Sequence, residues 1–268
     1  MHYLKTLWQF VHLDLRQSYF KRYFIIVELI SLFLTILIYH YTAKAFVPKA
    51  GSGLNFFGED FFSFLFWGDL VLRIPQSFFF SPVNNLKQAI AESTFEPMIL
   101  HTRSEQLIFL SLSVMQIFRE LITVIVMIAI AVIFFDLHIP PAGLLKMVLL
   151  TLAFTPVYVS IGIMMAALIF RLEKGEGILY LFSNCLAILA GMYFPVEVFP
   201  EFIQKIGLYL SPYSYFLRTA REYFSGKSLD SSLIIVFVLG LAAYVFSIFL
   251  MKQVYLGKRI RGDSLLMS

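Results

Sequence analysis

The chain has 268 residues, of which 59% are hydrophobic and 14% are charged, and its formal net charge is +4. Soluble domains are roughly 45–50% apolar and about 25% charged, so the composition excludes an ordinary soluble fold and indicates lipid as the solvent. The small, dispersed net charge argues against a nucleic-acid partner, and the single cysteine, Cys185, excludes a disulfide framework.

Six apolar stretches are long enough to cross a bilayer as helices, each of which needs about 20 mostly apolar residues. The runs are continuous and lack the alternation of a lipid-facing strand, so we expect an all-α polytopic membrane protein in which residues 1–268 form one transmembrane domain. In chain order, the six expected transmembrane helices are Tyr23–Tyr41, Phe56–Phe80, Leu107–Phe135, Leu144–Phe170, Ile178–Phe194 and Ser231–Met251.

The basic residues predict the orientation of these spans. With six crossings, the side that holds both termini carries twelve lysines and arginines in its loops and tails, and the opposite side carries seven. Because basic residues are enriched in cytoplasmic segments, we expect both termini in the cytoplasm.

Five charged residues lie within the expected spans and away from their ends: Glu28, Asp69, Arg73, Arg119 and Glu120. A charge at the bilayer centre costs roughly 2.5–3.5 kcal/mol, so such residues face the protein interior and find partners. Asp69 and Arg73 are four residues apart, share a helix face and can neutralise each other. Two interpretations of the five residues stay open. They are satisfied interior ion pairs, or they form a polar lining for substrate or a latch at a dimer interface.

Two connections between spans differ from ordinary loops. Residues 84–105 are the longest polar stretch and are expected in the cytoplasm, where a short helix is limited by Pro97. Residues 195–226 are divided by prolines into pieces too short to span, with charged and apolar side chains interleaved. For this segment we expect short amphipathic helices resting in or dipping into the extracytoplasmic interface. A solvated loop and a structured surface loop are the respective alternatives.

In this order and position, the two connections resemble those of the ABC-2 type permeases, the membrane subunits of one class of ABC exporters. The run from Ser93 to Ser104 follows a family pattern like GT-L-E-x-L-L-x-T-P-x-S. It departs from this pattern in having Ser93 for the usual glycine, Pro97 within the pattern and Arg103 where proline is common. The family's G-x-x-F-P element is similar to residues 191–195, and its P-x-x-Y/F element to residues 212–215. The resemblance covers essentially the whole chain.

The resemblance implies a permease subunit of a bacterial inner-membrane exporter, which moves a lipid-like, glycolipid or hydrophobic substrate outward. It implies a homodimer with two copies of a separate ABC ATPase, surrounded by membrane lipids. It also implies that residues 1–22 form an amphipathic helix on the cytoplasmic surface; a segment that only anchors the topology is the alternative. The coupling helix that docks on the ATPase would comprise Ala91, Glu92, Ser93, Thr94, Phe95, Glu96 and Pro97.

No nucleotide-binding loop is visible in the sequence. The string Gly226-Lys227-Ser228 lacks the first glycine of a P-loop, since that position is Arg221. We therefore expect no catalytic, cofactor-binding or metal-binding residue in this chain, with ATP and Mg²⁺ bound by the partner ATPase.

Two other classes of function stay open for this chain. Both would use the carboxylates of Glu28, Asp69 or Glu120. One is a secondary transporter driven by an ion gradient, which predicts transport without ATP. The other is an intramembrane lipid-modifying enzyme, which predicts product formation by the purified chain alone.

Overall fold

The computed structural model describes residues 22–46, 61–91, 105–137, 141–172, 176–224 and 232–261. Within these ranges the chain is helical and has no strand, which confirms the all-α class for the described part. The longer helices are α2 (Arg22–Phe46), α3 (Phe61–Ala91), α5 (Glu105–Phe135), α6 (Pro141–Leu172), α7 (Glu176–Leu189) and α10 (Ser232–Arg261). Three short helices lie between α7 and α10, namely η3 (Val196–Val198), α8 (Glu201–Leu210) and α9 (Pro212–Phe224).

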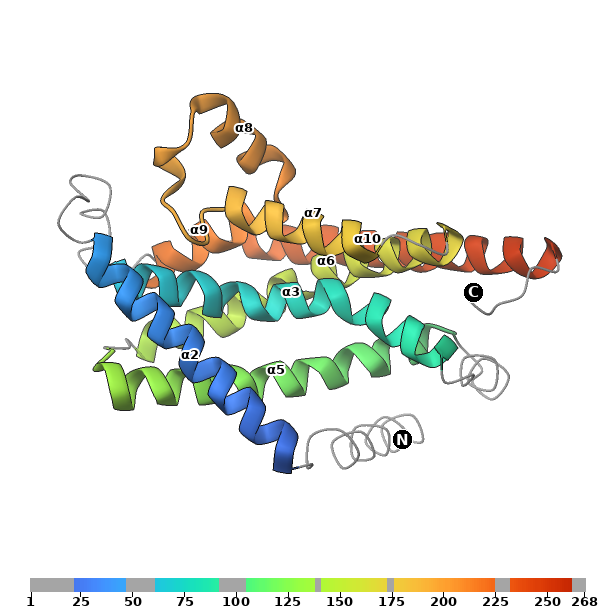
Figure 1. The fold of residues 1–268 in the computed structure, drawn as a ribbon. Coiled ribbons are helices and arrows are strands. Elements are labelled where there is room, and N and C mark those ends of the chain that lie inside the picture. The colour runs from blue at the N-terminus through green and yellow to red at the C-terminus, as the bar shows by residue number, and fades with distance from the viewer. Residues whose placement is uncertain are drawn as a thin grey trace.

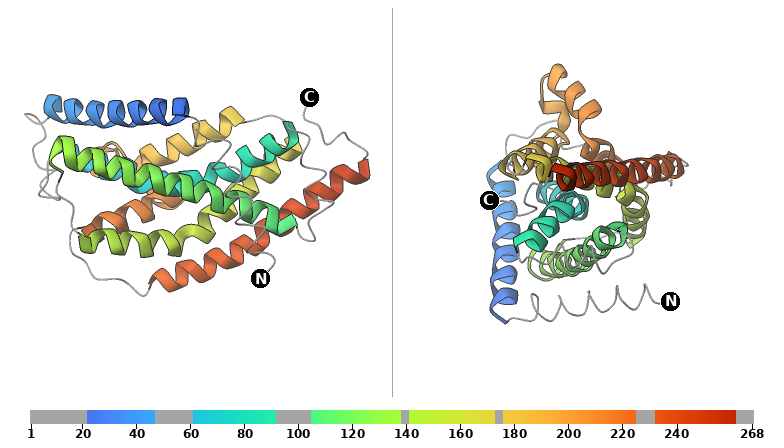
Figure 2. Two further views of the ribbon diagram at one scale, coloured as in Figure 1. Left: turned by 90° about the horizontal axis from the view of Figure 1, so that it is seen from below. Right: turned by 90° about the vertical axis from the view of Figure 1, so that its right-hand side faces the viewer.

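The long helices lie lengthwise beside one another, and α2 crosses α3 and α5 obliquely (Figure 1). We call the end of the bundle at which α3 begins the Phe61 end, and the end at which α3 finishes the Ala91 end. α9 packs against α3, α6 and α7. α8 stands out from the side of the bundle, as the right-hand view of Figure 2 shows.

Within the described part of the chain, three helices are long and apolar enough to cross a membrane: Ile25–Ala45, Gly143–Leu172 and Ser232–Gly257. α7 adds a shorter apolar stretch, Leu179–Leu189. α3 and α5 have 31 residues each, so at a rise of 1.5 Å per residue each is about 46 Å long. The expected count of six spans stays a prediction.

α3 runs past the expected end of the second span at Phe80 and continues to Ala91, with Pro75 and Pro82 inside it. Each proline removes the N–H that would bond the carbonyl four residues earlier, which for Pro82 is the carbonyl of Phe78. Gly162 of α6 lies against this freed carbonyl, because a Cβ on Gly162 would be 2.7 Å from Phe78 O. The missing side chain thus brings the two helices close together where α3 is weakened.

α7 ends at Leu189, so the expectation that the fifth span continues to Phe194 is wrong. Gly191 has a φ of +84°, which glycine adopts readily. Met192 N donates to Ala187 O and Gly191 N donates to Ile188 O, which is the Schellman pattern of a helix end. The glycine therefore stops the helix and turns the chain toward α8.

Candidate functional site

α3 is buried along nearly its whole length except for one narrow row of side chains. Among the α3 residues whose burial is described, only Ser63 and this row are half-buried or exposed. The row repeats at three- and four-residue steps, so it follows one face of the helix. We call it the α3 strip, and its members are Arg73, Gln76, Phe80, Asn84 and Lys87. Four of these five side chains are polar or charged, in a helix whose other faces pack against protein.

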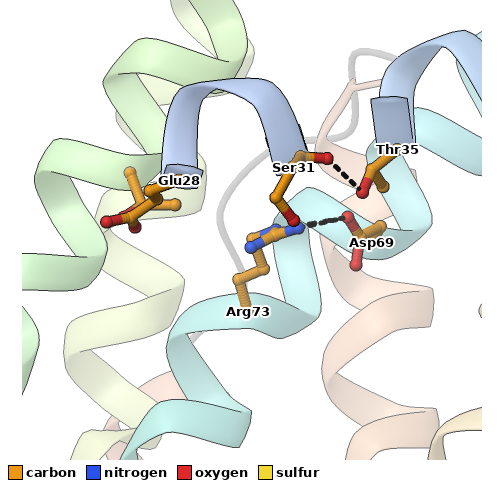
Figure 3. Close-up of polar contacts among 6 residues, drawn as sticks. Glu28, Ser31, Thr35, Asp69 and Arg73 are labelled. Atoms are coloured by element: carbon orange, nitrogen blue, oxygen red, sulfur yellow. Dashed lines mark hydrogen bonds and ion pairs between the residues drawn. The ribbon is translucent and has the colours of Figure 1, made fainter. Parts of the chain in front are cut away.

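Helices α7 and α2 flank the strip. Tyr180 of α7 stacks on Phe80 with ring centroids 4.6 Å apart, and its hydroxyl donates to Asn84 Oδ1 at 3.4 Å. On the α2 side, Figure 3 shows Ser31 beside Arg73 and Thr35 beside Asp69. The strip therefore lies on the side of α3 that is not fully covered by protein, between α2 and α7. We call this side the open face.

Asp69 and Arg73 form the ion pair that their four-residue spacing predicts. Both Nε and Nη2 of Arg73 lie 3.2 Å from Asp69 Oδ2 (Figure 3). The Asp69 side chain is 10% exposed and that of Arg73 is 23% exposed. Tyr39 of α2 also hydrogen-bonds to Asp69, and Tyr193 to Tyr39. The pair thus joins α3 to α2 and to the turn after α7.

Glu28 belongs to a second polar group, between α2 and α5. Thr123 Oγ1 lies 2.9 Å from Glu28 Oε1 and 3.2 Å from the carbonyl oxygen of Arg119. In Figure 3 the Glu28 side chain points toward α5 and away from the Asp69–Arg73 pair. Arg119 and Glu120 are half-buried on α5. Glu28 is therefore separate from the Asp69–Arg73 pair, and the role of the five charges in a pathway stays a prediction.

At the Phe61 end, three segments meet around one half-buried arginine. Arg221 of α9 donates from Nη2 to Gly191 O at 2.9 Å, and its guanidinium carbon lies 3.9 Å from the centroid of the Phe64 ring. Gly68 of α3 lies so close that a Cβ would be 2.3 Å from Met192 O. We call this group the arginine clasp, and its members are Phe64, Gly68, Gly191, Met192 and Arg221.

The clasp keeps its positive charge at neutral pH. Burial lowers the pKa of Arg221 to about 9, and the carboxylate of Glu197 opposes that shift. The hydrogen bond to Gly191 and the aromatic face of Phe64 both favour the cation. The clasp therefore fixes the turn after α7 and helix α9 to the start of α3.

A family model described as ABC-2 type transporter matches residues 5–225. The match covers most of the chain, including α2 to α9. The chain belongs to the ABC-2 type transporter family. No curated protein matches it. The family resemblance inferred from the two connections is thus confirmed, and the family implies a membrane transport component that pairs with an ABC ATPase.

In this ABC-2 transporter, the residues expected to dock on the ATPase follow directly from α3. Ala91 is the last residue of that helix. Glu92, Ser93, Thr94, Phe95, Glu96 and Pro97 lie outside the described residues, as do residues 1–21 of the expected interface helix. Their docking role stays a prediction.

Hydrogen bonds with two other helices fix the start of α9. Ser211 Oγ donates to Leu186 O at 2.9 Å, and Tyr158 of α6 donates from its hydroxyl to Pro212 O at 3.1 Å. Ser183 of α7 lies 3.2 Å from the Tyr213 hydroxyl. Tyr158 and Tyr213 are fully buried, so α9 begins inside the bundle and ends at the clasp.

We expect Tyr158→Phe to lower the stability of the protein modestly. The change removes the only hydroxyl on this ring and leaves Pro212 O without that donor, for a loss of about 1–2 kcal/mol. The thermal unfolding midpoint in detergent measures this loss of stability. Tyr215→Phe is the matched control, because the Tyr215 hydroxyl lies at an exposed contact with Ser232 and its loss should have little effect. Equal midpoints for the two variants would contradict the buried bond.

Sequence reasoning missed the clasp and the strip. The sequence indicated Arg221 only as the residue in place of the first glycine of a P-loop, although it is the centre of the clasp. Gly68 was not singled out, yet a lone glycine in a run of large aromatic residues is a sign of close helix approach. The strip was detectable from the three- and four-residue spacing of polar residues after Asp69.

Proposed function

We propose that the chain is the permease subunit of an ATP-binding cassette exporter and that the α3 strip forms part of the wall of its pathway. The strip itself supports this proposal most strongly. Arg73, Gln76, Asn84 and Lys87 are half-buried or exposed along a helix of a membrane protein. A polar or charged side chain that faced hydrocarbon would cost free energy. Such side chains therefore line a water-filled path or meet another subunit.

A second copy of the chain would close the open face between α2 and α7. In this homodimer each α3 strip contributes one wall of the pathway. Polar side chains alternate with the stacked Phe80 and Tyr180 rings, which suits a lipid-like, glycolipid or hydrophobic substrate that carries a polar part.

The energy would come from two copies of a separate ABC ATPase that binds ATP and Mg²⁺. α3 is a single helix from the Asp69–Arg73 pair to Ala91, with Pro75 and Pro82 inside it, and the docking segment begins at Ala91. A displacement of that segment would therefore move the strip directly. In this arrangement the Ala91 end and both termini are cytoplasmic, and the Phe61 end faces outward from the bacterial inner membrane.

Reversing the charge of the docking segment is expected to uncouple ATP hydrolysis from transport. Glu92→Lys and Glu96→Lys, and the helix break Thr94→Pro, should each lower transport by about tenfold or more, since a lost charged contact is worth roughly 1.5–3 kcal/mol. The chain is co-expressed with its ATPase and reconstituted in proteoliposomes, where substrate movement and phosphate release are measured together.

Lys44→Glu is the control for this experiment. It also reverses an exposed charge, but it lies at the Phe61 end of α2, away from the docking segment. In this variant, ATP hydrolysis should stay coupled to transport as it is in the unaltered chain. Normal transport in all three docking variants would contradict the docking assignment, and transport that persists without ATP would favour a secondary transporter.

A further inference from the structure

A pocket of about 580 Å³ lies at the Phe61 end, between the turn after α7 and helices α8 and α9. This volume falls within the roughly 300–1,000 Å³ of small-molecule sites. No residue of the α3 strip lines the pocket, so it is separate from the proposed pathway wall. Its apolar lining consists of Phe64, Ala190, Pro195, Val196 and Leu208.

The rest of the lining carries charges of both signs, of which some are already engaged. Arg218 Nε lies 3.2 Å from Glu222 Oε1, and Arg221 is held in the clasp. Glu201 and Lys205 are exposed, one helical turn apart on α8, and neither forms an ion pair within the described residues. Glu197 also lines the pocket, and its negative charge acts on the guanidinium of Arg221. Apart from these two charges, the carboxylate of Glu201 and the ammonium of Lys205 remain available at the mouth of the pocket.

The neighbouring face of α8 indicates where this mouth lies. Phe202 is 73% exposed and Tyr209 is 86% exposed. The two aromatic residues are seven positions apart, so they share one side of the helix. Exposed aromatic rings on a short helix of a membrane protein are typical of the headgroup level of a leaflet. The pocket thus opens where amphiphiles present their polar heads.

We infer that this pocket binds an amphiphile with a zwitterionic head, such as the phosphoethanolamine head of a phospholipid. Its ammonium pairs with Glu201, its phosphate pairs with Lys205, and its apolar part lies against Phe64, Val196 and Leu208. A ligand with one charge would leave one of the two rim charges without a partner. The inference requires membrane embedding, and it does not depend on the direction or energy source of transport.

The test is a binding titration of the purified full-length chain in detergent. A short-chain phosphatidylethanolamine is compared with phosphatidylglycerol of the same chain length, which has the phosphate but lacks the ammonium. The zwitterionic lipid should bind about fivefold more tightly or better, because one further charged contact is worth about 1 kcal/mol at an exposed site.

Two variants separate the two contacts. Glu201→Gln should weaken phosphatidylethanolamine binding about fivefold and leave phosphatidylglycerol binding unchanged. Lys205→Met should weaken the binding of both lipids by a similar factor. Lys44→Met, which removes a lysine at the same end of the bundle but outside the pocket, should change neither. Equal affinities for the two lipids, or phosphatidylethanolamine binding that is insensitive to both pocket variants, would overturn the inference.

A final measurement identifies the source of the amphiphile. Fluorescent phosphatidylethanolamine is placed in proteoliposomes that contain the chain and its ATPase. ATP-dependent movement identifies the occupant as cargo, and retained binding without movement identifies it as a resident lipid; both results support the pocket. Because the titration needs no ATPase, its failure would overturn the pocket and leave the proposed transport function standing.

Discussion

Gly68→Ala is expected to prevent the Phe61 end of the bundle from assembling. The new Cβ would lie 2.3 Å from Met192 O and 3.2 Å from Arg221 Nη2. The first of these contacts is with a backbone whose position is fixed by the end of α7, so neither side can yield easily. Overpacking of this kind costs about 3 kcal/mol or more. In detergent, the thermal midpoint should fall by roughly 6–12 °C, or the protein should fail to purify as one species.

Gly177→Ala is the matched control, since no atom lies within 4 Å of the position that its Cβ would occupy. Alanine is the better helix former, so this variant should be neutral or more stable by up to about 1 kcal/mol. The same holds for Gly257 of α10. If Gly68→Ala melted at the same temperature as these controls, the close approach of α3 to the turn after α7 would be absent from the protein in solution.

The helical class was predictable because it depends on local properties. Long apolar runs without alternation must form helices in a membrane, since each backbone group in lipid must then hydrogen-bond within its own helix. The positions of α2, α6 and α10 follow from the same runs. The end of α7 was harder to predict, because the apolar run continues through Tyr193 and Phe194. There a single glycine with a positive φ decided the boundary.

The clasp could not be derived from local pattern. Arg221 meets Phe64 and Gly191, which lie on α3 and on the turn after α7, far apart in the sequence. Only the packing of α9 into the bundle brings them together. The Glu28 contact shows the same limit. One of the two interpretations of the charged residues would pair this carboxylate with a basic group, whereas the structure places the Thr123 hydroxyl against it.

Asp69→Asn is expected to destabilise the protein more than Arg73→Met, although both break one ion pair. Without the carboxylate, the partly buried guanidinium keeps its charge, because arginine does not lose its proton. Without the arginine, the carboxyl can take up a proton and still bond to Tyr39. We expect a loss of about 3 kcal/mol for the first change and about half of that for the second. Thermal midpoints in detergent give the ranking.

The double variant Asp69→Asn/Arg73→Met separates stability from transport. It leaves no uncompensated charge, so its midpoint should recover to within about 1 kcal/mol of the original protein. If Arg73 also forms part of the pathway wall, the recovered protein should still transport poorly with its ATPase, because the strip has lost a charged side chain. Full recovery of both stability and transport would show that the pair only holds α3 against α2. A double variant no more stable than Asp69→Asn would show that the two side chains act separately.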